Sequence, residues 1–244
     1  MDKNKFDKII NNYRNERDTT NSIGTLGEKS LHNILKNYLQ EDKSKHEIKI
    51  GRHVADIFDG EKITEIQTRD FYPLNKKLDA FLPQYKVEIV FPVAFDKYVC
   101  WIDTENGELT KKRKSPKNAT ICEILPQIYK LRKHMFNENL SFRIVSIGAE
   151  EYRLLDGWSY DKKRGSHRFE LVPTRLFDEI TISNSSDYKR FLFGLDMEEF
   201  TSKDFSRFSK LSPAKARTAL LVLTRFGAVV RTGKKGNTII YKKA

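Results

Sequence analysis

The chain has 244 residues, of which 39% are hydrophobic and 11% aromatic, enough for a buried core, and this excludes wholesale disorder. Its 45 Lys and Arg against 33 Asp and Glu give a net charge of +12, which favours a polyanionic partner, either nucleic acid or an anionic membrane surface. The two cysteines lie far apart without His or Cys at metal-ligand spacing, so no zinc site is indicated.

The start of the chain lacks the apolar core of a secretory signal. No stretch approaches the roughly eighteen apolar residues of a membrane span. We therefore expect a cytoplasmic protein.

The first part of the chain has the pattern of an α/β domain with a mixed sheet. A polar segment over residues 1–20 predicts a short helical extension, and apolar residues at helical spacing from Leu31 to Leu39 predict a second helix. The other elements that we expect here are strands at residues 46–50, 54–58, 62–68, 87–91, 98–103, 142–148 and 169–172 and helices at 74–82 and 120–135. Helices placed between later strands are typical of this fold class.

The composition changes at the turn-rich stretch Ser183–Ser186. We place a domain boundary there, between a first domain of residues 1–184 and a second, smaller α+β domain of residues 187–244. A helix is expected directly after the boundary, followed by two helices and a strand pair.

Local signals define the last elements. Thr201, with Asp204 three residues later, predicts a capped helix, and Ser212 followed by proline predicts the start of another that ends at Gly227. Two β-prone runs joined by a tight turn at Gly233–Gly236 close the chain.

This order of three helices and a hairpin resembles the winged helix-turn-helix family. In that family the last helix enters the major groove of duplex DNA, and the hairpin, or wing, touches the backbone or the minor groove. The resemblance implies DNA-contacting residues on the last helix and on the wing. They are Ser212, Lys215, Arg217, Thr218, Arg231, Lys234, Lys235 and Asn237. The alternative is a protein–protein module whose charges form a solvated face.

The excess positive charge is concentrated in this region. Thr201–Ala244 contains eleven Lys or Arg and one acid, so it carries +10 and leaves only +2 for the first 200 residues. This density favours a DNA-binding face. It disfavours a membrane anchor, because the region resembles a winged helix and not an amphipathic membrane helix.

A possible carboxylate site lies in the stretch VADIFDGEKITEIQTR, which spans residues 54–69. Asp59-Gly60 between two β-prone runs predicts a hairpin with a two-residue turn. That turn pairs Phe58 with Glu61 and makes Asp56 and Glu65 diagonal neighbours on one face, about 7–8 Å apart. Alternation extends this face to Gln67 and Arg69. Two like charges at this separation are unfavourable unless a cation lies between them, and hard oxygen ligands suit Mg²⁺.

These residues resemble the PD-(D/E)XK nuclease superfamily, which includes type II restriction enzymes, junction resolvases and the endonuclease subunits of some transposases. That family carries an acid on one strand, E/D-X-K on the next, and often a Glu on a preceding helix. Asp56, preceded by Ala55 where the family has Pro, matches the first acid. Glu65-Ile66-Gln67 stands where E-X-K belongs, with Gln67 in place of the lysine, and Glu28 in GTLGEKSLH matches the helical acid. The resemblance covers roughly residues 20–150.

The resemblance implies a restriction-endonuclease-like mixed sheet flanked by helices and a Mg²⁺-dependent DNA endonuclease, with Mn²⁺ able to substitute. Gln67 and Arg69 would assist catalysis. The implied metal ligands are Glu28, Asp56, Glu65 and the backbone carbonyl of Ile66. Cutting both strands of duplex DNA needs two active sites, hence a homodimer or a partner nuclease or transposase subunit. The domain order is similar to the endonuclease subunits of heteromeric transposases, and it also suits restriction or phage defence.

The same residues have structural interpretations. Thr25 and Glu28 fit a capping box, and Glu65 and Gln67 fit the solvated face of an edge hairpin. The functional alternative is a non-catalytic DNA-binding regulator whose first domain is a degenerate nuclease fold. An enzyme that acts on structured RNA is a third possibility.

Overall fold

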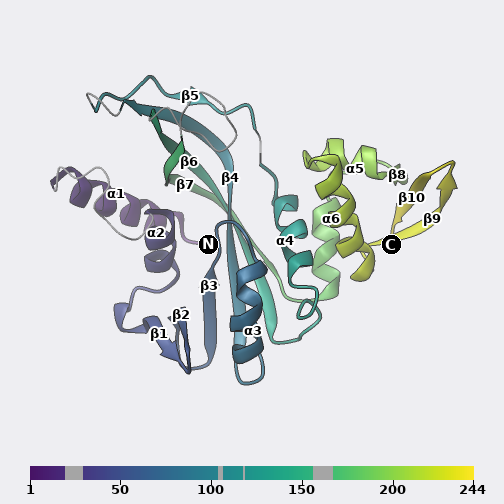
Figure 1. Cartoon of the computed structure of the whole chain (residues 1–244), viewed down its shortest axis with the longest axis horizontal. Coiled ribbons are helices and arrows are strands. Elements are labelled where there is room, and N and C mark those ends of the chain that lie inside the picture. The colour runs from purple at the N-terminus through teal and green to yellow at the C-terminus, as the bar shows by residue number, and fades with distance from the viewer. Residues whose placement is uncertain (20–29, 104–106, 118, 156–166) are drawn as a thin grey trace. The chain divides into compact units, whose positions relative to one another are not determined.

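The computed structural model describes residues 1–19, 30–103, 107–117, 119–155 and 167–244, and its elements confirm a mixed α/β protein (Figure 1). The helices are α1 (Lys3–Thr19), α2 (Ser30–Leu39), α3 (Asn75–Phe81), α4 (Leu125–Lys130), α5 (Ser202–Ser209) and α6 (Pro213–Arg225). Short 3₁₀ helices are η1 (Lys43–Lys45), η2 (Tyr72–Leu74), η3 (Ile121–Ile124) and η4 (Ser185–Leu192). None of the helices within these ranges is long and apolar enough to cross a membrane.

The strands form two sheets. They are β1 (His46–Ile50), β2 (His53–Phe58), β3 (Lys62–Ile66), β4 (Lys86–Asp103), β5 (Arg113–Lys114), β6 (Leu140–Leu155), β7 (His167–Ile182), β8 (Glu199–Thr201), β9 (Val229–Lys235) and β10 (Thr238–Lys243). The larger sheet has the order β1-β2-β3-β4-β6-β7, with β5 paired to β4, and the smaller one has the order β8-β10-β9. Because β2 and β3 are antiparallel and β3 and β4 parallel, the expected mixed sheet is confirmed.

Strand β4 is continuous where the sequence predicted two strands. Pro92 lies inside it, although proline cannot donate a ladder hydrogen bond. The neighbouring β3 ends at Ile66, whose partner on β4 is Val90, so β3 requires no donor at Pro92. The predicted break was wrong because the neighbouring strand ends before Pro92.

The chain divides into two compact units. Unit 1 comprises Met1–His46, Ala94–Asn118 and Val145–Asp178, and unit 2 comprises Glu47–Val93, Ala119–Ile144 and Glu179–Ala244. Unit 2 therefore holds the β2–β3 hairpin, α3 and α4 together with all elements from η4 onward. The boundary expected between residues 184 and 187 stays a prediction.

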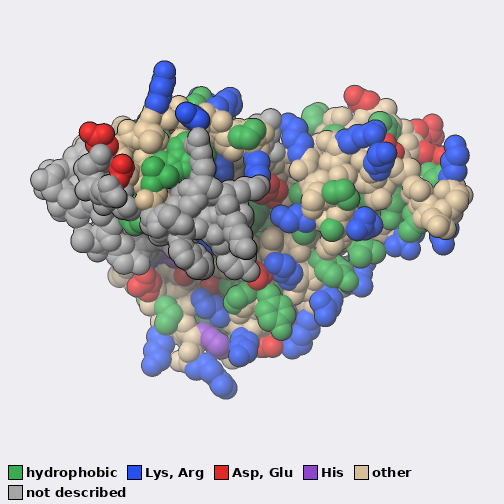
Figure 2. All heavy atoms as spheres, turned by 45° about the horizontal axis from the view of Figure 1, so that its top comes forward, with side chains coloured by type: hydrophobic (Ala, Val, Ile, Leu, Met, Phe, Trp, Pro, Cys, Tyr) green, Lys and Arg blue, Asp and Glu red, His purple; other side chains and the backbone are tan. Residues whose placement is uncertain are grey.

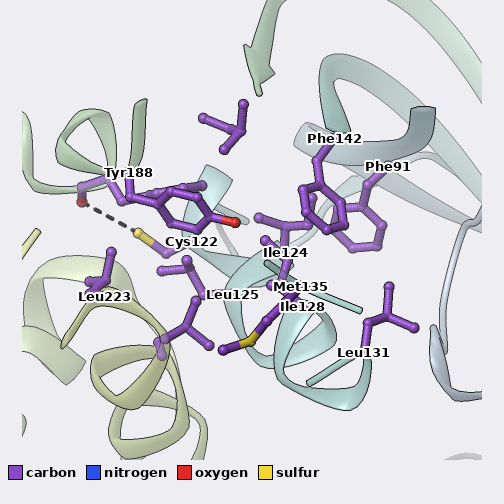
Figure 3. Packing of buried hydrophobic residues seen from close by; sticks show 14 of the residues in the cluster. Phe91, Cys122, Ile124, Leu125, Ile128, Leu131, Met135, Phe142, Tyr188 and Leu223 are labelled. Carbon is purple, nitrogen blue, oxygen red and sulfur yellow. Dashed lines mark hydrogen bonds between the residues drawn. The ribbon is translucent and has the colours of Figure 1, made fainter. Parts of the chain in front are cut away.

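Helix α6 is held in unit 2 by an apolar face. Figure 3 shows Leu223 of α6 near Leu125 of α4, and both side chains are buried. The ring of Tyr188 stacks on Phe226, directly after α6, with centroids 3.8 Å apart. The opposite face of α6 is left to solvent.

Both predicted helix starts are confirmed. Thr201 and Asp204 form a capping box at α5, and Ser212 is the N-cap of α6, with Pro213 in the first turn. The predicted hairpin turn was wrong, because β9 runs through Gly233 as far as Lys235. The chain reverses at Gly236, whose φ of 59° is in the left-handed region that glycine tolerates.

Candidate functional site

The hairpin of β2 and β3 forms, but its register is shifted by two residues from the prediction. Phe58 pairs with Ile63, so the loop holds four residues instead of Asp59-Gly60 alone. Oδ1 of Asp59 accepts hydrogen bonds from the amides of Glu61 (3.0 Å) and Lys62 (2.8 Å), which stabilises the wider loop. Because side chains alternate with a period of two, this shift keeps every residue on its predicted face.

The shift brings Asp56 and Glu65 into a closer relation than predicted. Ile57 pairs with Thr64, so the next position along this register sets Asp56 directly opposite Glu65. Oδ2 of Asp56 accepts a hydrogen bond of 2.7 Å from the Ile66 amide, just beyond the last paired residues of the hairpin. Only 2% of Glu65 is exposed to solvent, so Glu65 is not part of a solvated face.

Glu65 has a cationic partner that the motif did not indicate. Lys77 on α3 places Nζ 2.7 Å from Oε2 of Glu65. Lys77 lies four residues before the buried Phe81, so it shares the core-facing side of its helix, and this spacing was the available signal. The pairing itself could not be deduced, because it depends on how α3 packs against β3.

The second oxygen of Glu65 is left uncompensated. Oε1 is buried and has no hydrogen-bond partner among the residues that the structure describes. Burial and then the charge of Asp56 raise the pKa of Glu65 from 4.5 to about 7, against the opposing effect of Lys77. The carboxylate is thus short of positive charge even with Lys77 in place.

Three other predicted site residues lie elsewhere or outside the described chain. Gln67 donates from Nε2 to the Asp70 carbonyl, so its side chain is engaged in the loop after β3. Arg69 is exposed in that loop, beyond the end of β3 at Ile66, so the strand alternation from which its place was predicted does not reach it, and its role stays a prediction. Glu28, like its possible capping partner Thr25, lies outside the described residues.

The donors that are present suit a hard divalent cation. Two carboxylates lie on adjacent strands, and one of them has a buried oxygen without a hydrogen bond, so a cation would relieve their mutual repulsion. Within the described ranges, no group of three or more His, Cys, Asp or Glu could hold a metal. Glu28, the third ligand that the sequence predicts, lies outside the described residues, so its role as a ligand stays a prediction.

The residues predicted to contact DNA are mainly exposed. The exposed ones are Ser212, Lys215, Arg217, Arg231, Lys234, Lys235 and Asn237. Thr218 is half-buried, and its hydroxyl donates to the Ala214 carbonyl at 3.2 Å. Figure 2 shows Lys and Arg side chains, with some Asp and Glu among them, on the visible face of the region that Figure 1 labels α5, α6, β9 and β10.

The five cations of this set have no acidic partner within the described part of the chain. None of them forms an ion pair with a residue that the structure describes, in contrast to Lys242, which pairs with Glu198 at 2.8 Å. The hydroxyl of Ser212 accepts from the Lys215 amide at 3.5 Å, and its own proton is available to an acceptor. The surface of α6 and β9 can therefore attract an anion.

The fold and the site define a mixed α/β protein with two opposed carboxylates at the end of a β-hairpin. The chain belongs to a family described as a domain of unknown function (DUF8091), whose model matches residues 29–183. An uncharacterized protein of Treponema pallidum (strain Nichols) is 28% identical over 230 residues, which cover 91% of this chain and 88% of that protein. No solved structure matches. The family model includes the hairpin and α3, whereas the similarity to the Treponema protein extends beyond it.

Proposed function

We propose that this protein is a Mg²⁺-dependent DNA endonuclease of the PD-(D/E)XK type. The observation that carries the proposal is the buried carboxylate of Glu65, whose Oε1 has no hydrogen-bond partner among the described residues and which lies close enough to Asp56 for the two charges to repel. Burying an acid beside another costs stability, since apolar residues would pack there at lower cost, and a role in a functional site accounts for the pair.

The residues of the chain have distinct roles in this proposal. Asp56 and Glu65 bind the cation, and the hydrogen bond from the Ile66 amide orients the carboxylate of Asp56. Lys77 supplies the positive charge that the motif lacks at Gln67. When bound, Mg²⁺ makes water more acidic and neutralises charge on the phosphate. As the family resemblance implies, attack on phosphorus is in line and leaves a 5′-phosphate and a 3′-hydroxyl.

The basic C-terminal region would hold duplex DNA. The order of α5, α6, β9 and β10 is similar to a winged helix-turn-helix, and its unpaired cations lie on the face of α6 and β9 that is exposed. Phosphate contacts by such side chains release counterions and drive binding without dependence on base sequence. The net charge of +10 in Thr201–Ala244 supports this assignment.

Plasmid cleavage by site variants tests the proposal. Wild-type protein with Mg²⁺ is expected to nick or linearise supercoiled DNA, and Asp56→Ala and Glu65→Ala to lose about a hundredfold or more of this activity. Glu61→Ala, in the exposed loop of the same hairpin, is the matched control and should retain it. Cutting that survives in both site variants would refute the site.

A non-catalytic DNA-binding regulator is the second candidate. Lys77 already pairs with Glu65, and the side chain of Gln67 is turned to the Asp70 carbonyl, as expected if the site had lost its metal. This candidate predicts tight, salt-dependent DNA binding without cleavage in Mg²⁺ or Mn²⁺.

A further inference from the structure

The carboxylate of Glu65 is already in contact with a cation of the protein itself. The Lys77 ammonium lies 2.7 Å from Oε2, and the two side chains are 27% and 3% exposed. Lys77 thus holds one oxygen of Glu65, and Oε1 is left for the proposed metal. A buried carboxylate with one ion-paired oxygen and one unbonded oxygen needs an explanation.

Another buried glutamate of this chain shows what a structural pair looks like. Glu151 is as buried as Glu65, but its Oε2 lies 2.6 Å from Lys97 and its Oε1 lies 2.7 Å from Arg153. Burial raises the pKa of Glu151, yet these two cations together hold it below its ordinary value. Both oxygens of Glu151 are therefore satisfied within the fold, whereas Glu65 is only half satisfied.

A divalent cation bound at Oε1 of Glu65 would weaken the contact of Lys77 with Oε2, because the two positive charges repel and a divalent cation carries twice the charge of either cation that shares Glu151. Lys77 can give way at little cost. Its four-carbon chain is flexible, its ammonium hydrates readily, and it already has partial access to solvent.

We propose that Lys77 is a built-in counter-ion of Glu65 that leaves it when a divalent cation binds, so that a free ammonium stands beside the site only in the metal-loaded protein. The inference rests on the proposed function, since it takes Glu65 as a metal ligand. It goes beyond that function in making Lys77 the residue that sets metal affinity.

Mn²⁺ binding to the full-length protein tests the inference. With free Mn²⁺ counted by electron paramagnetic resonance at a pH well above 7, where Glu65 is ionised in both proteins, Lys77→Met should bind Mn²⁺ about tenfold more tightly than the wild type, since a competing charge is gone. Lys133→Met is the matched control. Lys133 pairs at the surface with Asp79, which lies on the same helix as Lys77, and the Mn²⁺ affinity of this variant should equal that of the wild type. Unchanged or weaker binding by Lys77→Met overturns the inference.

A measurement on the wild type does not depend on how the variant folds. An amine-reactive reagent followed by mass spectrometry should label Lys77 several-fold faster after Mg²⁺ is added, with Lys133 as the internal reference. Labelling of Lys77 that Mg²⁺ leaves unchanged or slows overturns the inference.

The failures of the two proposals are distinguishable. Mn²⁺ binding that is lost in Glu65→Gln but unaffected in Lys77→Met leaves the proposed metal site standing and overturns only the role of Lys77. Absence of Mn²⁺ binding in both wild type and Lys77→Met overturns the metal site, and the inference with it. Binding that appears only in Lys77→Met supports the inference directly.

Discussion

Asp56 links the local backbone to the chemistry of the candidate site. Its carboxylate accepts from the Ile66 amide, and such side-chain bonds compete with the strand ladder. The same bond fixes Asp56 opposite Glu65. The electrostatic cost appears at Glu65, whose pKa rises to about 7 through burial and then through the charge of Asp56.

This shift predicts a pH dependence of stability in protein freed of metal with EDTA. The Glu65 carboxyl ionises near 4.5 when unfolded and near 7 when folded, so between these values the folded state binds more protons. The free energy of unfolding of the wild type relative to Glu65→Gln should therefore fall as pH rises through this window, by on the order of 3 kcal/mol. Urea denaturation from pH 4 to pH 8 measures it, and a difference that stays constant with pH contradicts the shift.

At the scale of elements, the helix starts could be predicted from the sequence, but the register of the hairpin and the contacts between elements could not. The caps at Thr201 and Ser212 depend on residues within one helical turn, and the sequence carries that information. The hairpin register depends on the amides that Asp59 accepts from, which the dipeptide Asp-Gly does not specify. Lys77 was missed because its pairing with Glu65 requires the packing of α3 on β3.

The capping box of α5 should contribute measurably to stability. The Thr201 amide and hydroxyl both donate to Oδ2 of Asp204, and the Asp204 amide donates to the Thr201 hydroxyl. Thr201→Ala should lower the free energy of unfolding by about 1 kcal/mol in urea denaturation. Thr238→Ala, at an exposed position of β10, is the control. Equal effects of the two substitutions would show that the cap does not stabilise α5.

The hairpin of β9 and β10 should contribute phosphate contacts. Lys234→Ala and Lys235→Ala should each reduce the slope of log affinity for duplex DNA against log salt concentration by about 0.9. Lys242→Ala, whose side chain is paired with Glu198, should change it less. Slopes that match the wild type in both wing variants would contradict a wing role in DNA binding.

At the scale of the whole molecule, the excess positive charge and the carboxylates of the candidate site lie in different parts of the chain. Thr201–Ala244 carries +10 of the total +12, and the opposed carboxylates lie within residues 29–183, which the family model matches. The mixed α/β class was predictable because periodicity and element order reflect the whole chain. The continuity of β4 through Pro92 was not, because it depends on where β3 ends.

Incubation of supercoiled plasmid with full-length protein and Mg²⁺, beside Glu65→Gln at equal DNA occupancy, tests the central claim most directly. The account predicts nicked or linear products with ligatable 5′-phosphate and 3′-hydroxyl ends from the wild type, and none from the variant or in EDTA. Plasmid that stays supercoiled while the wild-type protein is bound to it would contradict the claim.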